Sequence, residues 1–106
     1  MDVIKNFEKL LASGTDNAML RFGLGHAYFQ QGQFDKAVEH LATAVTQDPG
    51  YSAAWKIYGR ALSELGRPEE AADAYGKGIQ SAEKKGDIQA AKEMTVFLRR
   101  LEKARS

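Results

Sequence analysis

The residue types that most often carry catalysis are scarce in this chain. It has no cysteine and only two histidines, His26 and His40, so thiolate nucleophiles, disulfides and cysteine-bound zinc are excluded. No Ser, Asp or Glu stands beside either histidine in a recognised catalytic spacing, and no cluster has the spacing of a metal site. The glycines of Gly23-Leu24-Gly25 lie in a helical pattern with no strand before them, unlike a dinucleotide-binding loop. We therefore predict a protein that is not an enzyme and holds no cofactor or metal.

One pair of cations has a spacing that would place both on the same side of a helix. Lys56 and Arg60 are four residues apart in a segment that favours helix, so both side chains are expected on one helical face. His40 is instead expected on an outer, solvent-exposed face.

Composition and charge narrow the class of protein. The chain has 106 residues, 43% of them hydrophobic and 27% charged, which is typical of one compact globular domain. Its 15 Lys and Arg nearly balance its 14 Asp and Glu, so we expect neither a nucleic acid nor a membrane as partner. The first residues, MDVIKNFEKLL, do not resemble a signal peptide, and no apolar run approaches membrane-spanning length. We predict a cytoplasmic location.

Glycine and proline divide the chain into short segments that favour helix. The segments are rich in Ala, Leu, Glu, Lys and Gln, and none alternates with the period of a strand. We expect Asp16, Ser52 and Asp87 to be helix N-caps, because their short side chains can accept from free amides. The predicted fold is all-α, with helices near Asp2–Ser13, Asn17–Gln31, Phe34–Gln47, Ser52–Leu65, Pro68–Lys84 and Asp87–Ala104.

Small residues recur at matching places in two stretches that are 34 residues apart. Gly25 and Gly59 lie within helices, where glycine costs about 1 kcal/mol relative to alanine, so a neighbouring helix is expected to approach too closely for a side chain. Ala37 and Ala71 are small for the same reason on the next helix. The shared residues therefore predict the contacts within two helix pairs.

These repeated residues resemble the tetratricopeptide repeat, a helix–turn–helix unit of 34 residues. The matching residues are Leu24-Gly25, Tyr28, Gly32, Phe34, Ala37, Leu41, Ala44 and Pro49 in one unit, and Trp55, Tyr58-Gly59, Leu62, Gly66, Ala71 and Tyr75 in the next. The resemblance implies a solenoid of antiparallel helix pairs in a single domain over residues 1–106. We assign an N-terminal helix to 1–14, repeats to 18–51 and 52–85, and a C-terminal capping helix to 87–104.

The second unit and the two ends depart from a regular repeat. Gly78 and Glu83 stand where alanine and proline are usual, so the second helix of that unit is expected to run longer. Phe7 and Leu10 precede Leu41 and Ala44 by 34 residues, so the N-terminal helix resembles a second helix of a unit. The C-terminal helix fits a first helix if the register slips by two residues, and we expect both ends to cap a complete small module. Its apolar stripe, expected to be buried, comprises Ile88, Ala91, Met94, Thr95, Leu98 and Leu101.

In the tetratricopeptide family the first helix of each unit lines a concave groove that holds peptides or partner helices. The resemblance places Leu24, Tyr28, Trp55, Tyr58 and Leu62 in the core. It implies that the binding residues are Met19, Phe22, His26 and Phe29 in the first unit, Lys56, Arg60 and Ser63 in the second, and Lys92 and Arg99 in the C-terminal helix. Further groove positions are Gln30, Ala53, Glu64, Gln89, Val96 and Arg100.

Alternatives remain open for several of these residues. Phe22 and Phe29 either bind a ligand or pack on the N-terminal helix, and Lys92 and Arg99 are either ligand contacts or solvated charges of a cap. A full carboxylate clamp of the kind known in the family is not expected, because Phe22 and His26 stand where such clamps have asparagines.

The function we predict is that of a protein-binding adaptor or small chaperone-like subunit. Its partner would be a protein or peptide with an acidic or carboxylate group beside an apolar anchor. The alternative is a structural module that associates weakly with copies of itself as a homo-oligomer and has no separate peptide ligand.

Overall fold

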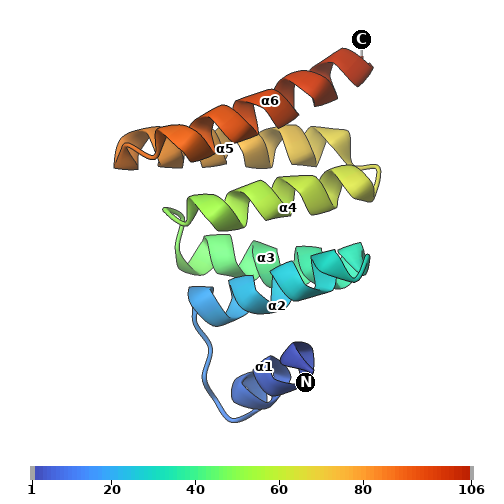
Figure 1. Cartoon of the computed structure of the whole chain (residues 1–106), viewed down its shortest axis with the longest axis vertical. Helices are drawn as coiled ribbons and strands as arrows, with labels where there is room; N and C mark the ends of the chain where they lie inside the picture. The colour runs from blue at the N-terminus through green and yellow to red at the C-terminus, as the bar shows by residue number, and fades with distance from the viewer. Residues whose placement is uncertain (1, 106) are drawn as a thin grey trace.

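The computed structural model describes residues 2–105, and within that range it contains helices and no strand (Figure 1). The all-α fold is confirmed, and each predicted helix is present with its ends within one residue of the expected positions. The helices are α1 (Val3–Ala12), α2 (Ala18–Gln30), α3 (Phe34–Gln47), α4 (Ser52–Glu64), α5 (Pro68–Lys85) and α6 (Ile88–Arg105).

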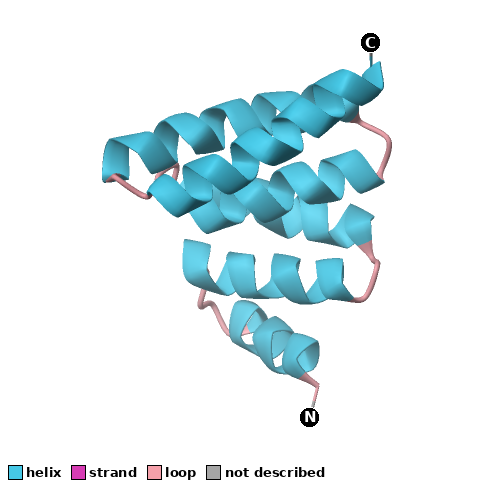
Figure 2. Ribbon diagram, turned by 45° about the horizontal axis from the view of Figure 1, so that its top comes forward, coloured by secondary structure: helices cyan, strands magenta, loops and turns pink. Residues whose placement is uncertain are grey.

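The helices stack in chain order, with α1 and α6 at opposite ends of the stack (Figures 1 and 2). Helices α2 and α3 form one antiparallel pair and α4 and α5 the next, and we call α2 and α4 first helices and α3 and α5 second helices. Helix α4 also contacts α2 on one side and α6 on the other, so these three line one side of the stack. None of the helices described is both long and apolar enough to cross a membrane.

Two neighbouring side chains hold the segment that leads into α2, one by capping the helix and the other by accepting hydrogen bonds from side chains of α2 and α3. Asn17 is the N-cap, and its side chain accepts from the backbone amide of Leu20 at 2.8 Å, so the prediction of Asp16 as the cap is wrong. Asp16 instead accepts two bonds of 2.9 Å from Arg21 and one of 2.9 Å from Gln47. The hydrogen bonds from Arg21 are the main cause that holds the pKa of Asp16 far below its usual value.

Of the two other predicted caps, Asp87 is confirmed and Ser52 is wrong. Ser52 is the first residue of α4 rather than its cap, and the cap residue Tyr51 makes no side-chain capping bond. Asp87 caps α6 as predicted, because its carboxylate accepts from the backbone amide of Ala90 at 3.1 Å. Ser52 is nevertheless buried, and its hydroxyl lies 3.4 Å from the carboxylate of Asp87.

The glycines shared by the two pairs mark the closest approaches of their helices. A Cβ atom built on Gly25 would lie 2.5 Å from the side chain of Leu41, and one on Gly59 would lie 2.5 Å from the ring of Tyr75. Ala37 is fully buried, and so is Ala71 at the matching place. Each second helix therefore packs against its first helix at a distance that a side chain at the glycine would prevent.

Gly78, the residue that departs from the repeat pattern, is explained by the position of α6. A Cβ atom there would lie 2.5 Å from the sulfur of Met94 and 2.6 Å from Cβ of Trp55. Met94 is fully buried in this space, and α5 is 18 residues long against 14 for α3, as the missing proline predicted. The predicted burial of Ile88 is wrong, since this residue at the start of α6 is 66% exposed.

The core lies between the two helix pairs and beneath α6. Leu24 and Leu62 are fully buried and Tyr28 and Trp55 nearly so, as the sequence predicted. Tyr58 is only half-buried, although it packs against the same cluster.

Candidate functional site

The side formed by α2, α4 and α6 carries an arginine held between two aromatic rings. The guanidinium carbon of Arg60 lies 4.9 Å from the ring centroid of Phe29 and 5.3 Å from that of Phe97. We call these three residues the Arg60 stack. Contacts of this kind contribute about 0.5–1 kcal/mol each at exposed sites. Arg60 is exposed, and among the described residues no carboxylate lies within ion-pair distance of it.

Both rings of the Arg60 stack are supported from behind. Phe97 stacks on Tyr75, with centroids 5.8 Å apart, and Tyr75 is 2% exposed. Burial raises the pKa of the Tyr75 hydroxyl to about 12. Phe29 meets Phe34 edge to face at 5.3 Å. The orientation of the guanidinium is therefore set by side chains that are themselves packed, which is how a preorganised binding site is built.

Lys56, predicted to act together with Arg60, is already paired. Its ammonium lies 3.4 Å from a carboxylate oxygen of Glu93 and joins α4 to α6. Both side chains are partly exposed, so this ion pair contributes little to stability. Of the two predicted cations of α4, Arg60 is the one without an acidic partner among the described residues.

The aromatic residues at the start of α2 form a second group. Phe22 stacks on His26 at 5.6 Å with nearly parallel rings, and it meets Tyr51 at 5.0 Å. Met19, three residues before Phe22, is 75% exposed. Helix α1 packs on the neighbouring Gly23, against which the ring of Phe7 lies.

The structure therefore separates the predicted binding residues into groups. Phe29 and Arg60 meet directly, whereas Lys92 and Arg99 are exposed along α6 and line a hollow of about 550 Å³ at the end of the stack. Ser63 is exposed on α4 and belongs neither to the Arg60 stack nor to the lining of this hollow.

Sequence reasoning missed two residues that complete the site. Glu93 and Phe97 were not expected to face α4, because the slipped register placed Val96 in the groove instead. The signal available was spacing, since Glu93 and Phe97 repeat the four-residue interval of Lys56 and Arg60 at a distance of 37 residues. That signal becomes usable only once α4 and α6 are known to lie side by side.

His40 is half-buried, so its predicted solvent exposure is wrong. Its ring stacks on Tyr28 at 5.6 Å, and Nδ1 lies 3.2 Å from Nη1 of Arg21. Because arginine can only donate, Nδ1 must be the unprotonated nitrogen. Burial, followed by the charge of Arg21, lowers the pKa of His40. Tyr28 in turn donates to Glu8 at 2.7 Å, a bond that raises the Tyr28 pKa to about 12. This network joins α1, α2 and α3.

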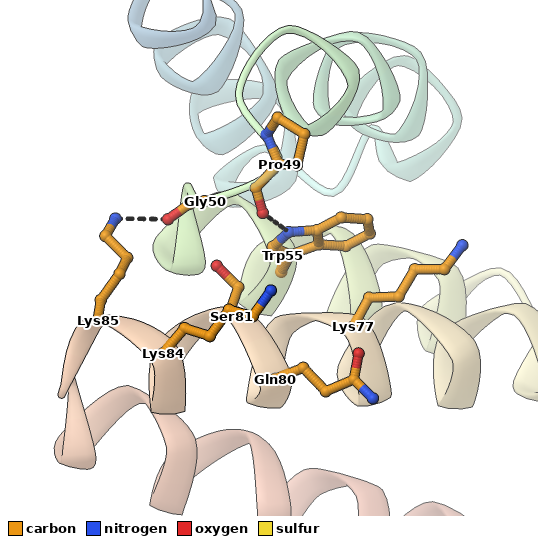
Figure 3. Close-up of a pocket in the computed structure, with 8 residues that line it drawn as sticks. All are labelled: Pro49, Gly50, Trp55, Lys77, Gln80, Ser81, Lys84 and Lys85. Carbon is orange, nitrogen blue, oxygen red and sulfur yellow. Dashed lines mark hydrogen bonds between the residues drawn. The ribbon is translucent and has the colours of Figure 1, made fainter.

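A further hollow, of about 370 Å³, lies on α5 beside the turn between α3 and α4 (Figure 3). The indole nitrogen of Trp55 donates to the carbonyl oxygen of Pro49 at 2.8 Å, and Lys85 donates to that of Gly50. The hydroxyl of Ser81 points toward this turn and, in the described structure, is buried without a hydrogen-bond partner. The polar contacts here anchor the turn to α5.

In the described part of the chain no group of three or more His, Asp or Glu residues could hold a metal ion.

Comparison with known proteins gives consistent matches along the chain. A family model for the tetratricopeptide repeat matches residues 4–52 and 22–88. The TPR repeat-containing protein PA0015 of Pseudomonas aeruginosa is 50% identical over 104 residues, which are 98% of this chain and 99% of that protein. The solution structure of protein BPP2914 from Bordetella parapertussis is 43% identical, with a TM-score of 0.84 over 98% of this chain and 90% of that one.

A more distant match extends to a protein with a described role. The heat-shock protein cognate co-chaperone sgt12 of Aspergillus fumigatus is 33% identical over 78 residues, which are 74% of this chain but only 23% of that protein.

Proposed function

The chain belongs to the tetratricopeptide repeat family, and on that premise we propose that it is a non-enzymatic protein-interaction module. It holds a peptide or partner helix on the side formed by α2, α4 and α6. The observation that carries this proposal is the Arg60 stack, a cation without an acidic partner among the described residues and held in place by two supported rings.

The chemistry of the Arg60 stack defines the ligand. A guanidinium suits a carboxylate, which it can bind through two parallel hydrogen bonds. Phe29 and the neighbouring cluster of Phe22 and His26 are all partly exposed and offer apolar contact along α2. The ligand is therefore a segment with an acidic side chain or terminal carboxylate next to an apolar anchor. Lys56 has a lesser role, because Glu93 already neutralises it.

The relatives support an adaptor role. The related sgt12 protein is named as a co-chaperone, and it is 33% identical to this chain over 78 residues. We therefore propose an adaptor or chaperone-like subunit that acts in the cytoplasm. The second candidate, self-association without a separate ligand, is favoured by the exposed apolar side chains at the two ends, Leu10 on α1 and Val96 on α6.

Selection from a library of random peptides displayed on phage tests the ligand class. Wild-type protein should enrich peptides that carry Asp, Glu or a free carboxylate near a large apolar residue, and Arg60→Glu should lose this enrichment. Lys9→Glu is the matched control, because Lys9 is exposed on α1 and α1 does not contact α4. Light scattering over a range of concentrations tests the second candidate. A protein that enriches no peptide and dimerises as its concentration rises would replace the proposed function with self-association.

A further inference from the structure

Helix α6 has the contacts of a first helix, against the preceding α5 and α4, but no second helix follows it in the described chain. Helix α2 is covered by α3 and α4 by α5, whereas α6 is the last element of the described chain (Figure 1). Met94 and Thr95 follow Tyr58 and Gly59 by 36 residues, and Met94 fills the core as Leu24 does in α2. Within the described residues, no element covers the side of α6 that would meet a following second helix.

This open face of α6 is apolar and hollowed. Ile88 is 66% exposed and Val96 46% exposed, although both are large aliphatic side chains. Together with Ala91 and Thr95 they line the hollow of about 550 Å³, which the C-terminal end of α5 closes on one side through Glu83 and Gly86. A groove between a helix face and the end of its neighbour has the shape that an added helix fills.

The residue opposite an added helix limits what can fill the groove. In the two complete pairs this position is glycine, and the second helix brings Leu41 or Tyr75 to within 2.5 Å of where a Cβ would be. On α6 the position is Thr95, whose hydroxyl donates to the carbonyl oxygen of Ala91 at 2.7 Å. An added helix at the same distance must therefore place a small residue opposite Thr95, where α3 and α5 have large ones.

The positive charges beside the hollow indicate that the added helix is acidic. Two exposed cations of α6, Lys92 and Arg99, border the hollow. They are seven residues apart, which is about two helical turns. No ion pair engages either of them within the described residues. Acidic residues seven apart on an added helix would meet both cations, which gives specificity and a faster association rate.

A second copy of the chain fits this groove poorly. Its α1 resembles a second helix and exposes Leu10, but the exposed cations of α1, Lys5 and Lys9, would approach Lys92 and Arg99. Like charges brought together at an interface act against association.

We propose that the open face of α6 is a second docking surface, which takes an acidic amphipathic helix of a different protein. The bound helix has a small residue opposite Thr95 and two acidic residues seven apart opposite Lys92 and Arg99. This surface acts independently of the Arg60 stack, which lies where α6 faces α4.

The probe is a synthetic 18-residue amphipathic helix, about the length of α5, with an apolar stripe, a central alanine in that stripe and two glutamates seven apart. Two companions carry tyrosine in place of the central alanine or lysines in place of the glutamates. Each is titrated into isotope-labelled protein, and amide chemical shifts are followed by NMR. The alanine–glutamate peptide should shift amides along α6, and the tyrosine and lysine peptides should bind at least about tenfold more weakly.

Variants of the protein should reverse these preferences. Thr95→Gly should recover binding of the tyrosine peptide, and the double variant Lys92→Glu, Arg99→Glu should prefer the lysine peptide. Arg60→Glu should leave binding unchanged, which separates this surface from the proposed peptide groove. The proposal is overturned if millimolar alanine–glutamate peptide leaves α6 unshifted, if glutamate and lysine peptides bind equally, or if the shifts centre on the Arg60 stack.

Discussion

The guanidinium of Arg60 lies over the ring of Phe97, with its central carbon 5.3 Å from the ring centroid, and so couples α4 to α6. Phe97 stacks on Tyr75, so the position of its ring does not depend on Arg60 alone. A double-mutant cycle of Arg60→Ala and Phe97→Leu should therefore give a coupling free energy of unfolding of about 0.5–1 kcal/mol. Urea unfolding of the four proteins measures it. Strict additivity of the two substitutions would mean that this contact contributes nothing in solution.

Two glycines of α5 provide a matched pair for testing the packing of α6. Gly78 leaves no room for a Cβ beside Met94 and Trp55, whereas nothing lies within 4 Å of a Cβ at Gly76. Gly78→Ala should lower the free energy of unfolding by about 1–3 kcal/mol through overpacking. Gly76→Ala should raise it by about 0.5–1 kcal/mol, because alanine favours helix over glycine. Chemical denaturation measures the free energy of unfolding of both variants. Equal effects at the two sites would contradict the described position of α6.

Much of the fold could be predicted from single residues with one local cause. Gly25 and Gly59 are costly within helices, so their presence indicated close neighbours, and Leu41 and Tyr75 are those neighbours. In the sequence, Gly78 shows only as a departure from the repeat. The apolar stripe predicted that Met94 is buried, but its position against Gly78 depends on how α6 packs on α5, which no local pattern encodes.

Burial of His40 makes stability depend on pH. Its pKa is lowered in the folded protein, so the unfolded chain binds more protons as the pH falls below about 6.5. The free energy of unfolding should be highest above that pH and decline as the pH falls toward the folded-state pKa of His40. His40→Gln should flatten this dependence between about pH 7.5 and pH 5. Thermal unfolding across that range measures it, and parallel curves for wild type and variant would show that His40 is solvated.

The same helix, α6, should contain both a residue essential for stability and one that is not. Met94 is fully buried, so Met94→Ala should cost about 2–5 kcal/mol. Ile88 is 66% exposed, so Ile88→Ala should change stability by no more than about 0.5 kcal/mol. Calorimetric unfolding compares them. A small loss for Met94→Ala would mean that α6 is an appendage rather than part of the core.

The candidate site was less predictable than the fold, and electrostatic pairing is the reason. The four-residue spacing of Lys56 and Arg60 placed them on one face, but it does not show that Glu93 neutralises the first. The rings beside Arg60 come from α2 and α6, more than thirty residues away in each direction along the chain. Contacts between helices that are not neighbours in sequence require the geometry of the stack.

The central claim is that the side formed by α2, α4 and α6 binds an acidic, apolar-anchored segment at the Arg60 stack. Calorimetric titration of a display-selected peptide into wild type, Phe29→Ala, Arg60→Glu and the control Lys9→Glu tests it most directly. Two helix pairs offer a small surface, so we expect a dissociation constant of about 1 μM, or about −8 kcal/mol, for wild type and the control. Phe29→Ala and Arg60→Glu should each weaken binding at least about tenfold, and only Arg60→Glu should reduce its salt dependence. The same affinity in all four proteins would contradict the claim.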